Sequence, residues 1–305
     1  MNSVKPLVSI ICCAFNHGQY IRQCLEGFLI QKTDFAFEVL VHDDASSDDT
    51  AAIISDYVAK YPHIFKPVYQ KQNQFSLGIK IWPGYQFPRV MGRYVAICEG
   101  DDYWTDQYKL KEQVDFLEKN GNFAACFTNA EILNETDNSR RIYLNGLAEG
   151  KIPSETAILR GGALYPTASV VFRYSPRIPD LFKMIPELNG DNLLIMILAM
   201  QGDIYYFNRI TCTYRVWEGG VYSSVMNDIR TTLGRKRNTI KGLKKLKKIS
   251  ERPFRGYFKQ RISQESYFIL QHSGVLKNLG YLFKLTVKDS LRMLIYHKML
   301  SRNNF

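Results

Sequence analysis

The sequence lacks several features that would define its class at once. No apolar run approaches the roughly 18 residues that span a membrane, and the segment from Met1 to Pro6 is too short and polar for a secretory signal. None of the six cysteines belongs to a CxxC pair, so neither a disulfide framework nor a zinc site is indicated. These absences favour a folded cytoplasmic protein with reduced thiols.

Two nucleotide-binding signatures are also missing. The turn after the first apolar run reads Ala14-Phe15-Asn16-His17-Gly18, which is neither the GxGxxG of a Rossmann dinucleotide site nor a P-loop. A nucleotidyltransferase would ordinarily carry a basic glycine-rich loop at this position, so that class is disfavoured. We predict that His17 is a solvated turn residue.

Acidic residues are scarce at one end of the chain. The segment from Val225 to Phe305 holds 19 Lys and Arg against four Asp and Glu, whereas the remainder is close to neutral. Basic residues there alternate with Leu and Ile at helical spacing around residues 235–249 and 275–300. We therefore predict an α/β domain over residues 1–224 and a basic amphipathic α-helical region over residues 225–305.

Two roles suit this basic region. Cationic residues on one helical face and aliphatic residues on the other favour binding of residues 235–300 to an anionic membrane surface. The protein would then be peripheral at the inner face of the cell membrane. Packing on the first domain, or a contact that forms a homo-oligomer, is the alternative. No nucleic acid partner is expected, because no recognised nucleic-acid-binding fold accompanies the charge.

Strand and helix signals alternate over the first domain. Helical patterns separate the apolar runs, which predict strands at 7–14, 37–41, 65–69, 93–98, 123–128, 168–172, 204–207 and 210–214. Residues 134–165 are predicted to be loop, either alone or with a hairpin, and residues 193–200 a buried helix. Buried strands that alternate with helices predict an α/β fold with a mostly parallel central sheet flanked by helices.

Polar residues gather where three of these strands end. Asn16 follows the first strand, Asp43-Asp44 the second and Asp101-Asp102 the fourth. Ligands of open parallel sheets bind beyond the carboxyl ends of the strands, so we expect these residues to meet. Asp44 would hydrogen-bond a base or ribose there. Alternatively, it would cap the next helix, a role that Ser46 or Ser47 can also fill.

The pair Asp101-Asp102 is the most informative feature. Adjacent carboxylates at the end of a buried strand are costly unless a cation neutralises them. Mg²⁺ or Mn²⁺ on a diphosphate supplies that charge and prefers oxygen ligands. The alternative is a cap for a helix that begins near Asp106. Glu99 would orient the pair or contact a sugar, and Trp104 would be either an acceptor platform or a core residue.

In this order, the motifs resemble those of the family-2 glycosyltransferases. The resemblance covers roughly residues 5–224 and rests on the segments 8–11, 15–16, 43–50, 99–104, 190–191 and 214–221. It implies the GT-A fold and an inverting enzyme. Such an enzyme moves a sugar from a nucleotide-diphosphate sugar to a hydroxyl acceptor, here a glycan or lipid-linked acceptor in surface polysaccharide synthesis. A non-catalytic nucleotide-sugar-binding or scaffold protein of the same fold is the alternative.

The resemblance implies which residues contact the donor base. Cys13, Ala14 and Phe15 would line the nucleobase pocket, the first two chiefly through their backbone. Asp44 would accept a hydrogen bond from N3–H of the base, which uracil and thymine both present. A UDP-sugar, or else a dTDP-sugar, is therefore the expected donor.

The resemblance also implies a metal and a general base. Asp101 would lie by the ribose and diphosphate, and Asp102, with Asp101 beside it, would ligate Mg²⁺ or Mn²⁺. Asp191 would remove the proton of the acceptor hydroxyl, and Arg215 would aid the leaving group as a cation. Many relatives have a histidine at the position of Trp217, so the metal shell of this chain departs from the usual pattern. Trp217 would instead contact the acceptor or the diphosphate.

Overall fold

The computed structural model describes residues 5–220 and 229–272. The chain divides into two compact units, one up to Gly220 and one beyond it. The first unit is built around a single sheet, whereas the described part of the second consists of two helices.

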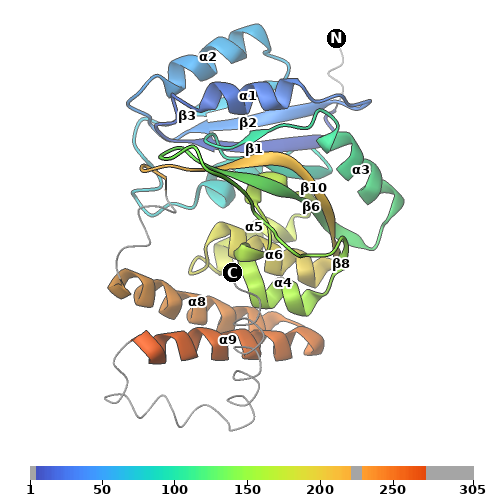
Figure 1. Cartoon of the computed structure of the whole chain (residues 1–305), viewed down its shortest axis with the longest axis vertical. Helices are drawn as coiled ribbons and strands as arrows, with labels where there is room; N and C mark the ends of the chain where they lie inside the picture. The colour runs from blue at the N-terminus through green and yellow to red at the C-terminus, as the bar shows by residue number, and fades with distance from the viewer. Residues whose placement is uncertain (1–4, 221–228, 273–305) are drawn as a thin grey trace. The chain divides into compact units, whose positions relative to one another are not determined.

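Ten strands form the sheet of the first unit, in the order β3-β2-β1-β4-β9-β6-β10-β5, with β7 beside β6 and β8 beside β10 (Figure 1). Strands β1 to β4 run parallel to one another, β10 is parallel to β6, and β9 is antiparallel to both of its neighbours. The predicted α/β fold with a mostly parallel sheet is confirmed. The strands are Val8–Ala14, Phe37–Asp43, Phe65–Tyr69, Tyr94–Ile97, Tyr103–Trp104, Phe123–Asn134, Arg140–Ile142, Gly150–Ile152, Val171–Arg173 and Asp203–Val216, numbered β1 to β10.

Helices cover both faces of this sheet. Figure 1 shows α1 and α2 on one side and α4, α5 and α6 on the other. The apolar residues of α1 recur at helical spacing and are buried, whereas α6 is apolar nearly all round and buries residues 193–199. The helices are α1 Ile21–Leu29, α2 Thr50–Lys60, α3 Lys109–Lys119, α4 Ser154–Arg160, α5 Arg177–Met184 and α6 Gly190–Gln201, with a short π-helix η1 at Trp82–Gln86.

One prediction for this unit was wrong, and another was incomplete. The segments 204–207 and 210–214 form one long strand, β10, whose pairing with β6 shifts register between Phe207 and Ile210. A bulge of this kind interrupts the apolar pattern without ending the strand. In residues 134–165, the hairpin alternative is confirmed, because β7 pairs antiparallel with β6, whereas β8 and the helix α4 were not predicted.

The second unit contains α8 (Ile229–Ile249) and α9 (Arg252–His272). Apolar residues of α8, including Leu233 and Ile240, pack with Ile269 of α9, and the Lys236 ammonium lies 2.7 Å from the Glu265 carboxylate. The predicted helix at 235–249 lies within α8. The second basic stretch, 275–300, falls outside the described residues.

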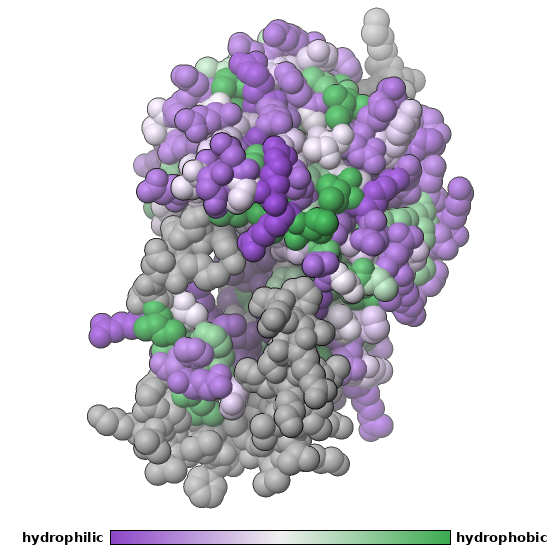
Figure 2. All heavy atoms as spheres, in the orientation of Figure 1, coloured by the Kyte–Doolittle hydropathy of each residue, from purple (hydrophilic) through white to green (hydrophobic). Residues whose placement is uncertain are grey.

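No helix among the described residues is both long and apolar enough to cross a bilayer. Where the described residues are visible in Figure 2, the surface is largely hydrophilic, with hydrophobic residues in separate groups.

Candidate functional site

Two consecutive carbonyls at the end of β1 bind two acidic turns. One turn follows β2 and contains Asp44, and the other follows β4 and contains Asp101 and Asp102. The Cys13 carbonyl accepts a hydrogen bond from the Gly100 amide, and the Ala14 carbonyl accepts one from the Asp44 amide, both at 2.9 Å. Because β1 lies between β2 and β4, the turns that follow those strands flank one strand end. The structure thus brings the Asp44 turn and the turn at residues 99–102 together.

Side chains also tie the turn after β1 to the turn after β2. The Asn16 amide donates to Ser46 Oγ at 2.9 Å, and Asn16 Oδ1 accepts from the Ser47 amide at 2.8 Å. Asn16 and Ala45 both have left-handed backbone, with φ of 56° and 61°, a strain typical of functional turns. The helix-capping role predicted for Ser46 or Ser47 is therefore wrong, since α2 begins only at Thr50.

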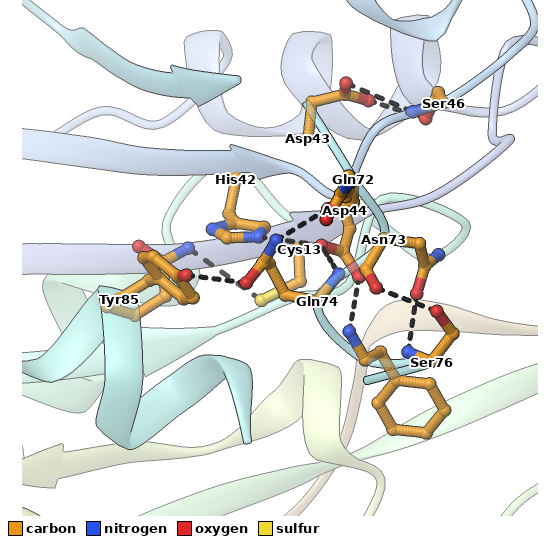
Figure 3. Close-up of polar contacts among 12 residues, drawn as sticks. Cys13, His42, Asp43, Asp44, Ser46, Gln72, Asn73, Gln74, Ser76 and Tyr85 are labelled. Carbon is orange, nitrogen blue, oxygen red and sulfur yellow. Dashed lines mark hydrogen bonds and ion pairs between the residues drawn. The ribbon is translucent and has the colours of Figure 1, made fainter. Parts of the chain in front are cut away.

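The Asp44 carboxylate holds the segment that follows β3 (Figure 3). Its Oδ1 accepts from the Gln74 amide at 2.8 Å and its Oδ2 from the Phe75 amide at 3.0 Å. His42 Nε2 lies 3.4 Å from Oδ1. An ionised carboxylate can accept about four hydrogen bonds, so one position on Oδ2 is left after the contacts to described residues.

Two exposed aromatic residues lie close in the chain to groups that Asp44 contacts. Phe15 follows the Ala14 carbonyl that binds the Asp44 amide and is 43% exposed. Phe75, whose own amide binds Asp44, is 59% exposed. Phe15 is therefore not a core residue. Exposed rings beside a buried hydrogen-bond acceptor suit a planar ligand that has both an apolar face and a polar edge.

Three carboxyl groups crowd the turn after β4. Burial, followed by the nearby Asp101, raises the pKa of Glu99 to about 7 and the pKa of Asp102 well above its usual range. The Asp102 side chain is kept in place by the Arg215 amide, which donates to Oδ1 at 2.9 Å. Concentrated negative charge at a buried turn favours either proton uptake or a bound cation.

Arg215 is the support of this turn. Its guanidinium donates to the Asp101 carbonyl at 2.7 Å and to Glu135 Oε1 at 2.6 Å, and it also bonds Gln23. The Tyr20 and Tyr103 rings lie 4.8 and 4.6 Å from its carbon Cζ. The Arg215 charge is paired with Glu135, and the buried side chain supports the turn. Its role as a cation that aids the leaving group stays a prediction.

Trp217 and His17 both approach the Asp101 carboxylate. The Trp217 indole donates to Asp101 Oδ2 at 3.0 Å, and His17 Nε2 lies 3.7 Å from the same oxygen. His17 is largely buried, and its Nδ1 has no hydrogen-bond partner among the described residues. The prediction that His17 is a solvated turn residue is therefore wrong. The apolar pattern around the turn after β1 does not indicate that the His17 ring contacts the turn after β4.

Trp104 belongs to the core rather than to an acceptor platform. It is 2% exposed, its indole donates to the Ala168 carbonyl at 2.7 Å, and it packs edge-on against Phe28. The buried Lys109 ammonium lies 4.4 Å from the ring centroid. No face of this ring is open to a sugar.

Asp191 lies at the start of α6, packed against the segment that precedes β9. A Cβ atom on Gly162 would collide with its carboxylate, and its carbonyl accepts from the Tyr165 hydroxyl at 3.1 Å. Burial raises the pKa of Asp191, and Lys80 opposes the shift. The capping position of α6 is Asn189, so Asp191 is not the cap of this helix.

The acidic turn offers oxygen ligands to a divalent cation but does not enclose one. After the bonds from Trp217 and Arg215, one oxygen each of Asp101 and Asp102 has no partner among the described residues. Across residues 5–220 and 229–272, no three His, Cys, Asp or Glu side chains are arranged to hold an ion. A metal here would need further ligands from a bound diphosphate, as Mg²⁺ commonly does.

Comparison with known sequences identifies the family. The sequence model described as glycosyl transferase family 2 matches residues 9–173, which is more than half of the chain. The chain belongs to glycosyl transferase family 2, and the resemblance noted from its motifs is confirmed.

Two relatives show how far the similarity extends. An uncharacterized protein of Mycobacterium tuberculosis is 33% identical over 223 residues, 73% of this chain and 62% of that protein. The putative teichuronic acid biosynthesis glycosyltransferase TuaG of Bacillus subtilis is 32% identical over 117 residues, 38% of this chain and 44% of TuaG. The chain thus spans less than two thirds of the length of these relatives.

Solved structures share the fold. TarS 1-349 of S. aureus, in complex with UDP-GlcNAc, matches with a TM-score of 0.58 at 17% identity, covering 93% of this chain and 77% of that one. The mannosyltransferase PcManGT from Pyrobaculum calidifontis, in complex with GDP-Man and Mn²⁺, has a TM-score of 0.57 at 13% identity, covering 97% and 81%. These likenesses confirm the expected GT-A fold.

Replacement of Arg215 by lysine tests whether this side chain stabilises the turn after β4. A lysine ammonium keeps the charge but cannot reach the partners on Glu135, Asp101 and Gln23 together, so we expect a loss of about 2 kcal/mol in unfolding free energy. Urea denaturation measures the change. Arg93→Lys, at an exposed ion pair with Glu118, is the control and should cost less than about 1 kcal/mol. Equal effects of the two substitutions would contradict the assignment.

Proposed function

We propose that the chain is an inverting glycosyltransferase that moves a sugar from a UDP-sugar, or else a dTDP-sugar, to a hydroxyl group of a glycan or lipid-linked acceptor. The observation that carries the proposal is the pair of hydrogen bonds from the two acidic turns to the Cys13 and Ala14 carbonyls. One side of this junction suits a base, and the other suits a cation-bound diphosphate.

The base would lie at Asp44. The acceptor position left on its carboxylate matches the N3–H of uracil or thymine, and the exposed Phe15 and Phe75 would contact the ring. The Cys13 and Ala14 carbonyls hold the two turns in place, so their part in the pocket would be to shape it. Asp44 keeps its bonds to the segment after β3 in this arrangement.

The diphosphate would lie at the acidic turn. Mg²⁺ or Mn²⁺, when bound there, would stabilise the negative charge that develops on the departing diphosphate. Asp102 and Asp101 would hold the ion, and the Arg215 amide and the Trp217 indole fix the orientation of these carboxylates beforehand. Glu99 would face the sugar from the same turn.

Asp191 would act as the general base. Its carboxylate would take the proton of the acceptor hydroxyl as that oxygen attacks the anomeric carbon from the face opposite the diphosphate. Burial against Gly162 raises its pKa and makes it a stronger base than an exposed aspartate. The nearby Lys80 favours the ionised form that the reaction needs.

Replacement of Asp191 by asparagine should abolish transfer but preserve donor binding. We expect turnover to fall by about a thousandfold, because general-base catalysis is lost while the nucleotide site is unchanged. UDP release from UDP-GlcNAc, measured with Mn²⁺, reports turnover, and thermal shift with UDP reports binding. Parallel assays with dTDP- and GDP-sugars define the base. A variant that retains full turnover would remove Asp191 from the mechanism.

The pH dependence of turnover is a second readout of the same assignment. A base works only when ionised, so wild-type turnover should fall as the pH drops through the raised pKa of Asp191. Lys80 and Tyr165 are the titratable groups next to this carboxylate. The residual activity of Asp191→Asn should lack this acidic limb. Nucleotide binding without turnover by the wild type, under all of these conditions, would favour the binding-protein alternative.

We further propose that the protein acts at the inner, cytoplasmic face of the membrane, held there by charge. In α8 the aliphatic face is buried, so it is not available for insertion into lipid. Six of the seven exposed cations of α8 fall on one arc of the helix, which suits adsorption to an anionic surface. These six are Arg230, Arg237, Lys241, Lys244, Lys245 and Lys248, and Arg235 is exposed outside the arc. The biosynthetic name of TuaG, which concerns teichuronic acid, agrees with such a setting.

Charge reversal on α8 tests this attachment. The triple variant Lys241→Glu, Lys244→Glu, Lys248→Glu should lose most binding to vesicles that contain phosphatidylserine, since each cation near the surface contributes about 1 kcal/mol. Sedimentation with vesicles measures the loss. The control, Lys60→Glu, Lys71→Glu, Lys119→Glu, changes the net charge equally at exposed sites of the first unit. Similar binding by both variants, or salt-independent binding, would contradict the proposal.

A further inference from the structure

Trp82 connects two parts of the site that are far apart in the sequence. It begins the π-helix η1, and its indole N–H donates to Glu99 Oε1 at 3.2 Å. Glu99 belongs to the acidic turn after β4. No sequence motif includes Trp82, so the sequence alone does not indicate a role for it.

The same ring packs against the start of α6. A Cβ atom on Gly190, the first residue of this helix, would lie 3.1 Å from Cε3 and Cζ3 of the Trp82 indole. That separation is tighter than ordinary contact, so the ring lies directly on the glycine backbone. Asp191 is the next residue. One side chain therefore contacts both the acidic turn and the backbone beside Asp191.

Aromatic neighbours hold the ring from a third side. The Phe87 and Phe182 ring centroids lie 6.4 and 6.2 Å from that of Trp82. Phe182 comes from α5, which ends shortly before α6. Trp82 is thus restrained by packing as well as by its hydrogen bond. A rigid ring that binds Glu99 through its N–H and packs on Gly190 through its apolar edge fixes the distance between these two residues.

We propose that Trp82 is a positioning residue that sets the separation between Glu99 on the donor side and Asp191 on the acceptor side. This inference rests on the proposed function, because it assigns the spacing of two groups that act in the same transfer. Attack on the anomeric carbon requires the acceptor oxygen to be aligned with the leaving group. A displacement of about 1 Å can cost about a hundredfold in rate.

Two substitutions disturb the two contacts separately. Trp82→Phe removes the N–H donor and retains an aromatic ring, whereas Gly190→Ala retains the donor and pushes the ring away from α6. We expect each to lower kcat by about tenfold to a hundredfold and to leave the donor KM within about threefold of wild type. Because both act on one link, the double variant should be far less impaired than the product of the single effects.

The control is Tyr174→Phe, which removes one hydrogen bond, to the Phe87 carbonyl, from the same aromatic cluster without touching Glu99 or Gly190. It should leave kcat within about twofold. If Trp82 had only a general packing role, Trp82→Phe, Gly190→Ala and Tyr174→Phe would all lower the melting temperature and change kcat and KM alike.

Three outcomes would overturn the inference: unchanged kcat in Trp82→Phe, multiplicative effects in the double variant, or a loss confined to KM. If Trp82→Phe does not fold, Gly190→Ala, which keeps the indole, carries the test. The proposed function fails separately, when the wild type transfers no sugar or Asp191→Asn remains active. A wild type without transfer would also remove the basis of this inference.

Discussion

The structure depends on the cost of crowding three carboxyl groups, with Asp102 buried, into the turn after β4. Burial raises the pKa of Glu99 and Asp102, which means that the folded chain resists the ionised forms of these groups. The neighbouring cation, Arg215, is already paired with Glu135. The turn therefore carries more acid than Arg215 can neutralise. Under the proposed function, a divalent cation that joins the turn to a diphosphate would offset this excess of acid.

Among the described residues, the surroundings of the turn orient these acids without adding a second cation beside them. Arg215 fixes the backbone of Asp101 and, through its own amide, the carboxylate of Asp102. The indoles of Trp217 and Trp82 each donate to one further acid of the turn, Asp101 and Glu99 respectively. Neutral donors of this kind orient a carboxylate without cancelling its charge. A full complement of buried cations would stabilise the fold better but would leave nothing for a metal to neutralise.

The sequence predicts the parts of this site that depend on strand order. Apolar runs place Asp44 and Asp101-Asp102 at the ends of β2 and β4, and a parallel sheet brings such ends to one edge. Contacts that depend on where a loop returns were not predictable. Asp44 binds residues 74 and 75, and Trp82 meets residues 99 and 190, with no periodic pattern to indicate either pairing. In the two-residue strand β5, alternation could not show that Trp104 faces the core.

Calorimetric titration of UDP into wild type and Asp102→Asn, with and without Mn²⁺, tests whether the acidic turn holds a metal-bound diphosphate. We expect Mn²⁺ to strengthen UDP binding at least tenfold in the wild type, and we expect this gain to be lost in Asp102→Asn. Mn²⁺ alone should bind weakly. UDP binding of equal strength with and without the ion, unaffected by Asp102→Asn, would show that the acidic turn does not grip a metal-bound diphosphate.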